Sequence, residues 1–132
     1  MMKRYINYSI VYAVLALVPG GVFYREFIKM NGCTAFTTLS VVHTHYFILG
    51  MMFFLILGLV SMNINLKNNR AVLFYNVGLK LMAIMLVVRG IVQVLDLNVV
   101  SAFISGVSGI GHIILGVSLI LILLDIKKAC IK

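Results

Sequence analysis

Four long apolar runs, separated by short polar segments, dominate the pattern of the chain. They extend from about residue 5 to 23, 37 to 60, 71 to 95 and 99 to 124. Each run approaches or exceeds the roughly 20 residues that an α-helix needs to cross the ~30 Å hydrocarbon core of a bilayer. The pattern therefore predicts an all-α integral membrane protein in which residues 1–132 form one domain of four transmembrane helices.

The connections between the runs predict how these helices are arranged. They cover residues 24–36, 61–70 and 96–98, and such short links are typical of an antiparallel up-down-up-down bundle. In a square bundle the second and fourth helices face each other diagonally, with axes about 12 to 14 Å apart. The sequence Pro19-Gly20-Gly21 interrupts the first run, so we expect a kink or an opening of the helix there.

The composition agrees with lipid as the main solvent of the chain. Of the 132 residues, 63% are hydrophobic and 11% are charged, which is too apolar for a soluble domain of this size. The first run follows Lys3 and Arg4 and so resembles a secretory signal. It lacks an A-x-A cleavage site, and we therefore interpret it as a retained anchor.

The basic residues indicate orientation rather than nucleic-acid binding. The formal net charge is +8, but no basic stripe with interleaved aromatic residues exists, so we expect no nucleic-acid partner. Only Arg25 and Lys29 fall on one side of the four-span arrangement. The other side carries the larger group of Lys3, Arg4, Lys67, Arg70, Lys127, Lys128 and Lys132. The positive-inside rule then predicts that both termini face the cytoplasm.

Three histidines fall inside the apolar runs: His43 and His45 in the second, and His112 in the fourth. Ionisable side chains are rare at membrane depth, because inserting an Arg, Lys or Asp at the centre of a membrane helix costs about 2.5 to 3.5 kcal/mol of free energy even on insertion scales. At 1.5 Å per residue, His43 and His45 lie roughly 9 to 12 Å below the outer boundary and His112 roughly 20 Å. Span ends read from sequence shift by 2 to 4 residues, so the depths could match.

Imidazole is a common ligand of haem iron, zinc and copper. No cysteine or carboxylate accompanies the histidines inside the membrane, which disfavours a zinc site, whereas a porphyrin needs only two axial donors. We therefore predict a b-type haem between the second and fourth helices, with His112 and either His43 or His45 as iron ligands. Structural hydrogen bonding between helices is the alternative role for these rings.

Only one of His43 and His45 can face the bundle axis, because residues two apart diverge by about 200° on a helix. His43 is favoured because it shares a face with Ser40, Phe47 and Gly50, although a rotated helix would present His45 instead. Small and aromatic residues could line the haem slot, namely Gly50, Tyr46, Phe47 and Phe54 of the second span and Gly109 and Gly116 of the fourth. Tight helix packing also explains the small residues.

Arg89 is a candidate partner for the haem propionates. Its planar guanidinium can grip a carboxylate with two hydrogen bonds, and the alternative is an ion pair with Glu26 or Asp96 near the same boundary. No function is assigned to Lys80, which lies deeper in the same span.

Three segments carry a resemblance to known families: GVFYREF at 21–27, LSVVHTHYFILGMMFFLI at 39–56 and SGIGHIILG at 108–116. Together they resemble small bacterial four-span membrane proteins, among them haem-sensing membrane proteins associated with defence against haem and oxidative stress. This resemblance implies haem binding and a location in the bacterial cytoplasmic membrane. The segment VVHTHYFILG is also similar to a low-spin haem ligand helix of haem-copper oxidases and nitric oxide reductases, which implies a ligand role for His43. The remaining spans of those enzymes are absent, so terminal oxidase activity does not transfer.

Three functions follow from these observations. The favoured one is haem sequestration or sensing for protection against oxidative stress. The second is a membrane haem oxidoreductase that exchanges electrons with a quinone, and the third is a structural or regulatory subunit without a cofactor. Hydrolase and nucleotide-binding motifs are missing, and whether the chain is an enzyme or forms a homo-oligomer stays open.

Overall fold

The computed structural model describes residues 2–66, 69–97 and 101–131, and the regular structure within these ranges is helical throughout. The first helix consists of α1 (Met2–Leu15), η1 (Ala16–Phe23) and α2 (Tyr24–Met30). The second consists of α3 (Leu39–His45), η2 (Tyr46–Met52) and α4 (Phe53–Asn63), and η1 and η2 are π-helical.

Two uninterrupted helices complete the fold, α5 (Asn69–Val94) and α6 (Ser101–Cys130). All four helices contain segments that are long and apolar enough to cross a membrane, which confirms the prediction of an all-α protein with four spans. The predicted start of the fourth span at Val99 and the end of the last connection at Asn98 lie outside the described residues.

The first helix is longer than the predicted run, because it continues past Phe23 through α2 to Met30, and Pro19 does not interrupt it. Proline has no backbone N–H, and a wider helical turn accommodates this loss. In η1 the backbone N–H of Tyr24 donates to the carbonyl of Pro19, five residues earlier, and the helix continues to Met30. The connection predicted at residues 24–36 therefore shortens to residues 31–38.

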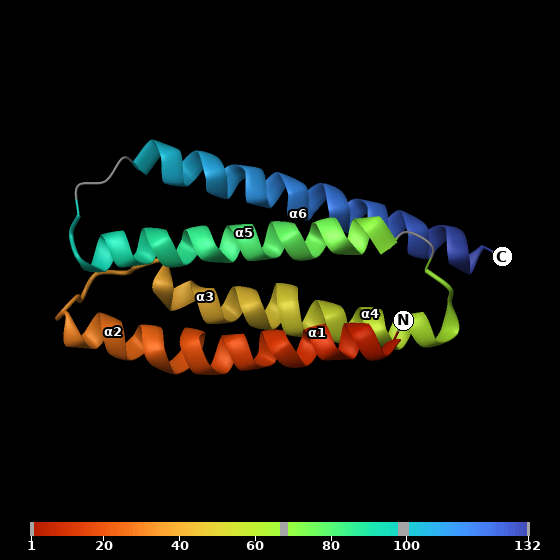
Figure 1. Ribbon diagram of the computed structural model, residues 1–132, viewed down its shortest axis with the longest axis horizontal. Helices are drawn as coiled ribbons and strands as arrows, with labels where there is room; N and C mark the ends of the chain where they lie inside the picture. The colour runs from red at the N-terminus through yellow and green to blue at the C-terminus, as the bar shows by residue number, and fades with distance from the viewer. Residues whose placement is uncertain (1, 67–68, 98–100, 132) are drawn as a thin grey trace.

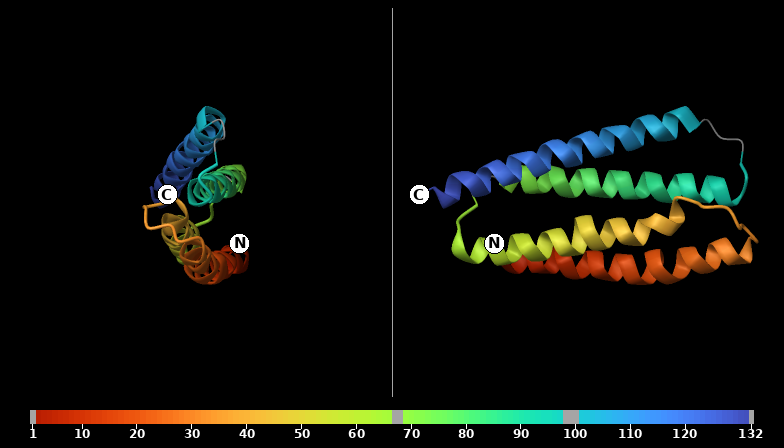
Figure 2. Two further views of the ribbon diagram at one scale, coloured as in Figure 1. Left: turned by 90° about the vertical axis from the view of Figure 1, so that its left-hand side faces the viewer. Right: turned by 180° about the vertical axis from the view of Figure 1, so that it is seen from behind.

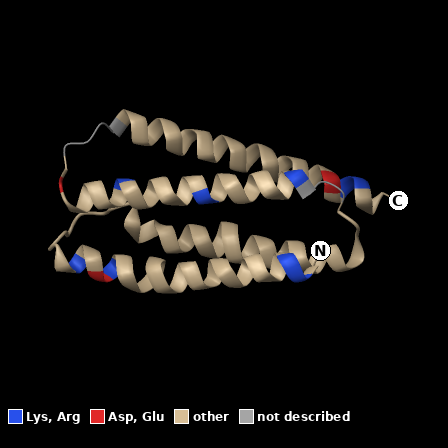
Figure 3. Cartoon of the chain, in the orientation of Figure 1, with Lys and Arg blue, Asp and Glu red and all other residues tan. Residues whose placement is uncertain are grey.

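The helices run antiparallel, and both chain termini lie at the same end of the molecule (Figure 1). We call this the terminal end, and the opposite end, which carries residues 31–38, the loop end. The first helix packs along the second, the second rests against α5, and α6 packs along α5 (Figure 2). Charged residues gather toward the two ends of the helices, as expected of membrane spans, while α5 also carries Lys80 near its middle (Figure 3).

An aromatic core holds the first helix, the second helix and α5 together. The ring of Tyr12 stacks on Phe54 with centroids 5.6 Å apart, and Phe53 stacks on Tyr75 at 4.0 Å. Two buried hydroxyls add hydrogen bonds: Tyr12 donates to Asn76 Oδ1 over 2.7 Å, and Tyr75 donates to the carbonyl of Leu49 in η2 over 2.8 Å. Each aromatic pair contributes about 0.5–1.5 kcal/mol beyond its buried area.

Glycines let α5 and α6 approach backbone to backbone. A Cβ built on Gly111 would lie 3.0 Å from the backbone nitrogen of Met82, and one built on Gly78 would lie 2.8 Å from that of Leu115. Backbone atoms cannot move aside as the end of a side chain can. These two contacts therefore fix the spacing and the register of α6 on α5.

The contact at Gly111 generates a prediction about stability. We expect Gly111→Leu to lower the free energy of unfolding by about 1–3 kcal/mol, because the added side chain must push the two backbones apart. Gly106→Leu on the same helix is the matched control, since nothing lies within 4 Å of a Cβ built on Gly106. Thermal unfolding in detergent, followed by circular dichroism, measures the difference, and equal stability of the two variants would contradict the assigned contact.

Candidate functional site

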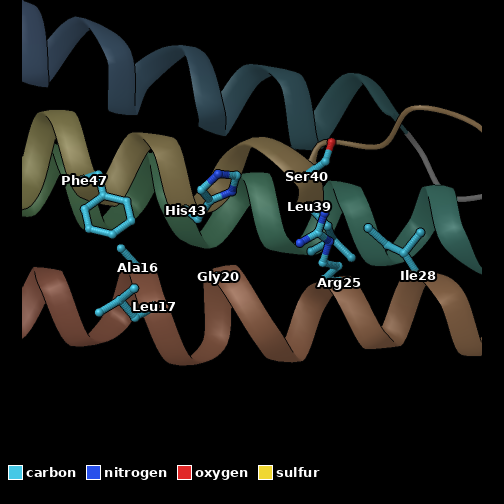
Figure 4. A pocket seen from close by; sticks show the side chains of 10 residues that line it. Ala16, Leu17, Gly20, Arg25, Ile28, Leu39, Ser40, His43 and Phe47 are labelled. Carbon is cyan, nitrogen blue, oxygen red and sulfur yellow. The ribbon is translucent and has the colours of Figure 1, made fainter.

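His43 and His45 point to opposite sides of the second helix. A Cβ built on Gly20 would lie 3.0 Å from both Cα and Cβ of His43, so His43 packs against the first helix. His43 also lines a groove between these two helices, into which Arg25 reaches from the other wall (Figure 4). His45 is turned about 200° away from this contact and lies on the side of the second helix that faces away from the first.

The sequence favoured His43 as the residue that faces the bundle axis, whereas the structure turns it toward the first helix. His45 is half-buried and borders a shallow depression of about 160 Å³ together with Thr44, Ile48 and Leu49. The first helix thus occupies the side of His43, and within the described chain the depression beside His45 is lined by residues of the second helix alone.

His112 lies on a flank of α6 that packs against the protein core near the terminal end and is exposed toward the loop end. Leu119 and Ile126, seven and fourteen residues further on, share this flank because seven residues complete almost two turns. Both pack against the core that the other helices build. His112 itself is exposed. The flank therefore faces the body of the protein, but nothing in the described chain packs over its histidine.

The contacts that the second helix and α6 make with α5 give the relative depths of the His45 and His112 rings. Leu39 of α3 contacts Gly90, and Gly111 of α6 contacts Met82. Because both helices run antiparallel to α5, His45 falls level with about residue 84 and His112 level with about residue 81. Three residues correspond to about 4.5 Å along the axis, so the rings lie at similar depths in the span.

The hydrogen bonds of His45 and His112 define which ring nitrogen is free. His45 Nδ1 lies 2.8 Å from the carbonyl of Val41, and His112 Nδ1 lies 2.9 Å from the carbonyl of Ser108. A carbonyl oxygen can only accept, so Nδ1 carries the proton and Nε2 of the neutral ring keeps its lone pair. Metal-ligating histidines commonly have this arrangement, with one N–H bound to a backbone carbonyl and the other nitrogen available.

His43 lacks this arrangement. Its Nε2 lies 3.3 Å from the hydroxyl of Thr44, and no bond ties its ring to a backbone carbonyl within the described part of the chain. Its imidazole is therefore less suited than those of His45 and His112 to present a lone pair away from the helix.

Small residues and a cation surround His112. A Cβ built on Gly109 or Gly116, one turn before and after the histidine, would meet nothing within 4 Å. Arg89 shares a face of α5 with Met82, seven residues away, so it lies on the side toward α6, about 10 Å nearer the loop end. We refer to His45, Arg89, Gly109, His112 and Gly116, which come from three helices, together as the open flank.

Arg89 is exposed and forms no ion pair within the described residues. The alternative partner Glu26 instead binds Lys29, with 3.1 Å between Nζ and Oε1. An exposed guanidinium on the open flank is therefore available to an anionic group.

The predicted lining residues of the second span lie elsewhere: Phe47 lines the groove between the first two helices, and Phe54 stacks on Tyr12. Gly50 faces the first helix, since a Cβ built on it would lie 2.5 Å from Cγ of Tyr12. The ring of Tyr46 packs 5.9 Å from that of Tyr12. Both residues belong to the contact between the first two helices, because η2 turns them and Phe54 toward Tyr12. They do not border the open flank.

Sequence reasoning missed the groove beside His43. Its polar residues, Arg25 and Ser40, lie on different helices with no shared motif, and only the close approach at Gly20 brings them together. The pair Gly20-Gly21 was the available signal, since small residues permit close packing of membrane helices. Within residues 2–66, 69–97 and 101–131, no three His, Cys, Asp or Glu side chains gather as a metal-ion site.

Comparison with known proteins gives one match. Residues 2–129 fit the model of a family described as a protein of unknown function, DUF2871. Neither the curated proteins nor the solved structures contain a match. Since the family model covers nearly the whole chain, the protein belongs to the DUF2871 family.

Proposed function

We propose that this protein binds a b-type haem on the open flank, with His45 and His112 as the two iron ligands. One observation carries the proposal: two imidazoles on different helices lie at similar depth, and each has its Nδ1 proton committed to a backbone carbonyl. In each ring this leaves Nε2 with a free lone pair, and an axial ligand needs such a lone pair to bind the iron.

The surroundings of the two rings fit a flat macrocycle. Gly109 and Gly116 leave the surface beside His112 without side chains, and no side chain of the described chain covers it. Arg89, nearer the loop end, is suited to bind a propionate. A bound haem would supply one-electron chemistry and strong visible absorption.

The groove beside His43 fits a haem less well. Its two walls are already in contact, because Gly20 touches the backbone of His43, and a macrocycle between them would have to separate the helices. The groove also contains one imidazole rather than two. These features favour His45 over His43.

Two histidine ligands favour haem sequestration or sensing over catalysis. Imidazoles in both axial positions leave no open position for a reacting molecule. Holding the group within the bilayer would also keep it from soluble oxidants, which agrees with a role in protection against oxidative stress. The proposal includes the location inferred from the sequence, a bacterial cytoplasmic membrane with both termini on the cytoplasmic side.

The ligand assignment is tested with single histidine variants. We expect His45→Ala and His112→Ala to lower haem content after reconstitution by at least about tenfold. Even the loss of a group that only hydrogen-bonds to a metal ligand typically lowers metal affinity 10–100-fold. His43→Ala is the matched control, two residues away on the same helix, and it should retain haem. The measurement is the Soret absorbance per protein, in the oxidised and the reduced state.

Two outcomes of this experiment would contradict the proposal. Retention of the Soret band in His112→Ala would show that α6 provides no ligand. Loss of haem in His43→Ala together with retention in His45→Ala would move the site to the groove.

The role of Arg89 is tested on α5. We expect Arg89→Ala to weaken haem binding by about tenfold, since a hydrogen bond to a charged group contributes roughly 1.5–3 kcal/mol. Lys80→Ala removes an equal charge from an exposed position of the same helix and should leave the affinity unchanged. Titration of the purified variants with haem measures both affinities, and equal weakening in the two variants would argue against a propionate contact.

The protonation of the two rings is a third test. We expect the neutral forms of His45 and His112 to carry their protons on Nδ1, because the carbonyls of Val41 and Ser108 can only accept. Nitrogen NMR of protein labelled with ¹⁵N-histidine, without haem, distinguishes the two tautomers by their chemical shifts. Protons on Nε2 in both rings would be inconsistent with their proposed readiness as ligands.

A further inference from the structure

The groove between the first and second helices is a second place where a ligand could bind. It measures about 390 Å³, within the usual range for small-molecule sites, and opens on one side toward the surroundings of the helices. Its floor lacks side chains at Gly20 and Gly21, and its apolar lining includes Ala16, Leu17 and Phe47. The groove lies between two candidate membrane spans, so its open side faces lipid.

The shape of the groove selects a narrow, flexible occupant. The first and second helices touch at Gly20 and His43, so the space beside this contact is too confined for a rigid ring system between the walls. An acyl chain can follow such a channel because its rotatable bonds adapt to the lining.

The charge in the groove selects an anionic head group. Arg25 is the one charged residue among those that line the groove, and it has no hydrogen-bond or ion-pair partner among the described residues. The neighbouring Glu26 is paired with Lys29 at 3.1 Å and lies outside the lining. Arg25 reaches from α2 toward Leu39 and Ser40 across the groove (Figure 4). The guanidinium therefore lacks a counter-charge at one end of an apolar channel.

Ser40 and His43 add polar contacts on the opposite wall. The Ser40 hydroxyl donates to the carbonyl of Thr37 over 2.5 Å, so its oxygen remains able to accept from a ligand hydroxyl. The His43 ring lies deeper along the same wall, between Ser40 and Phe47 (Figure 4). The polar groups thus cluster toward the loop end, and the apolar lining continues inward from them. This distribution matches an amphiphile, whose polar head would lie at the loop end and whose apolar tail would lie further inward.

We propose that this groove binds an anionic phospholipid of the surrounding bilayer, with its phosphate on Arg25 and one acyl chain along Ala16, Leu17 and Phe47. A guanidinium matches phosphate with two parallel hydrogen bonds, and Arg25 offers one at the mouth of the groove. The bilayer supplies such molecules at the mouth of the groove. This site is separate from the open flank and does not depend on haem.

The experiment compares lipid retention by native mass spectrometry. Full-length protein is exchanged into micelles that contain phosphatidylglycerol and phosphatidylcholine with identical acyl chains. We expect one phosphatidylglycerol to remain bound in preference to phosphatidylcholine, and Arg25→Ala to lower this preference by at least about fivefold. Lys29→Ala is the matched control, because it removes the same charge from the same helix outside the groove, and it should keep the preference.

A second variant tests the acyl channel with Arg25 intact. Gly21→Leu places a side chain in the groove, where a Cβ would meet only the carbonyl of Ala16, at an ordinary 3.4 Å. We expect this variant to fold and to lose the retained lipid. Equal retention of the two lipids by the unmodified protein, or equal effects of Arg25→Ala and Lys29→Ala, would overturn the proposal.

Two further measurements complete the test. Displacement of phosphatidylglycerol by equimolar oleate would overturn the assignment to a phospholipid and identify a free carboxylate instead. Haem content of Arg25→Ala should equal that of the unmodified protein. Loss of haem in this variant would place both ligands in one site and contradict the separation proposed here.

Discussion

Helices apolar enough to cross a membrane must satisfy their own hydrogen bonds, because lipid offers none, and this constraint is visible at every level of the structure. Backbone groups satisfy each other within helices, and where Pro19 removes a donor, the wider turns of η1 supply another pairing. Side chains follow the same rule, since the hydroxyls of Tyr12 and Tyr75 and the Nδ1 of His45 all bind acceptors of the protein. Among the described residues, the buried hydroxyls of Tyr5 and Thr37 are exceptions, for which we have no physical account.

The same constraint explains why the architecture could be predicted from the sequence. Helices that must satisfy all their backbone polar groups internally produce long apolar runs, and these runs located the four helices to within about three residues, except at two ends: the first helix continues to Met30 and the fourth to Cys130. The error at the first helix arose because Arg25, Glu26 and Lys29 end the apolar run, whereas the helix continues through them.

The histidines were selected as candidates from their depth in the apolar runs, but the directions of their side chains could not be predicted. The preference for His43 rested on Ser40, Phe47 and Gly50 as neighbours on one face, and that face does point inward. It points at the first helix, however, and not at α6. Which neighbour a face meets depends on the close contact between Gly20 and His43, and such a contact joins residues far apart in the sequence. For the same reason, the position of Arg25 in the lining of the groove could not be predicted from the sequence.

The π-helical segments have a consequence for how the family can vary. A π-helical turn holds one residue more than an α-helical turn. In η1 and η2 this extra residue changes the rotation, about the helix axis, of one flanking segment relative to the other. Removing one residue from either segment would convert it to an ordinary α-helix while leaving the dihedral angles on both sides intact. Alignments of this family are therefore expected to show single-residue gaps at Ala16–Phe23 or Tyr46–Met52 more readily than in the uninterrupted α5 and α6. A gap in η2 would rotate α3 by about one residue, roughly 100°, and so redirect His43 and His45, whereas a gap in η1 would rotate α2 and redirect Arg25.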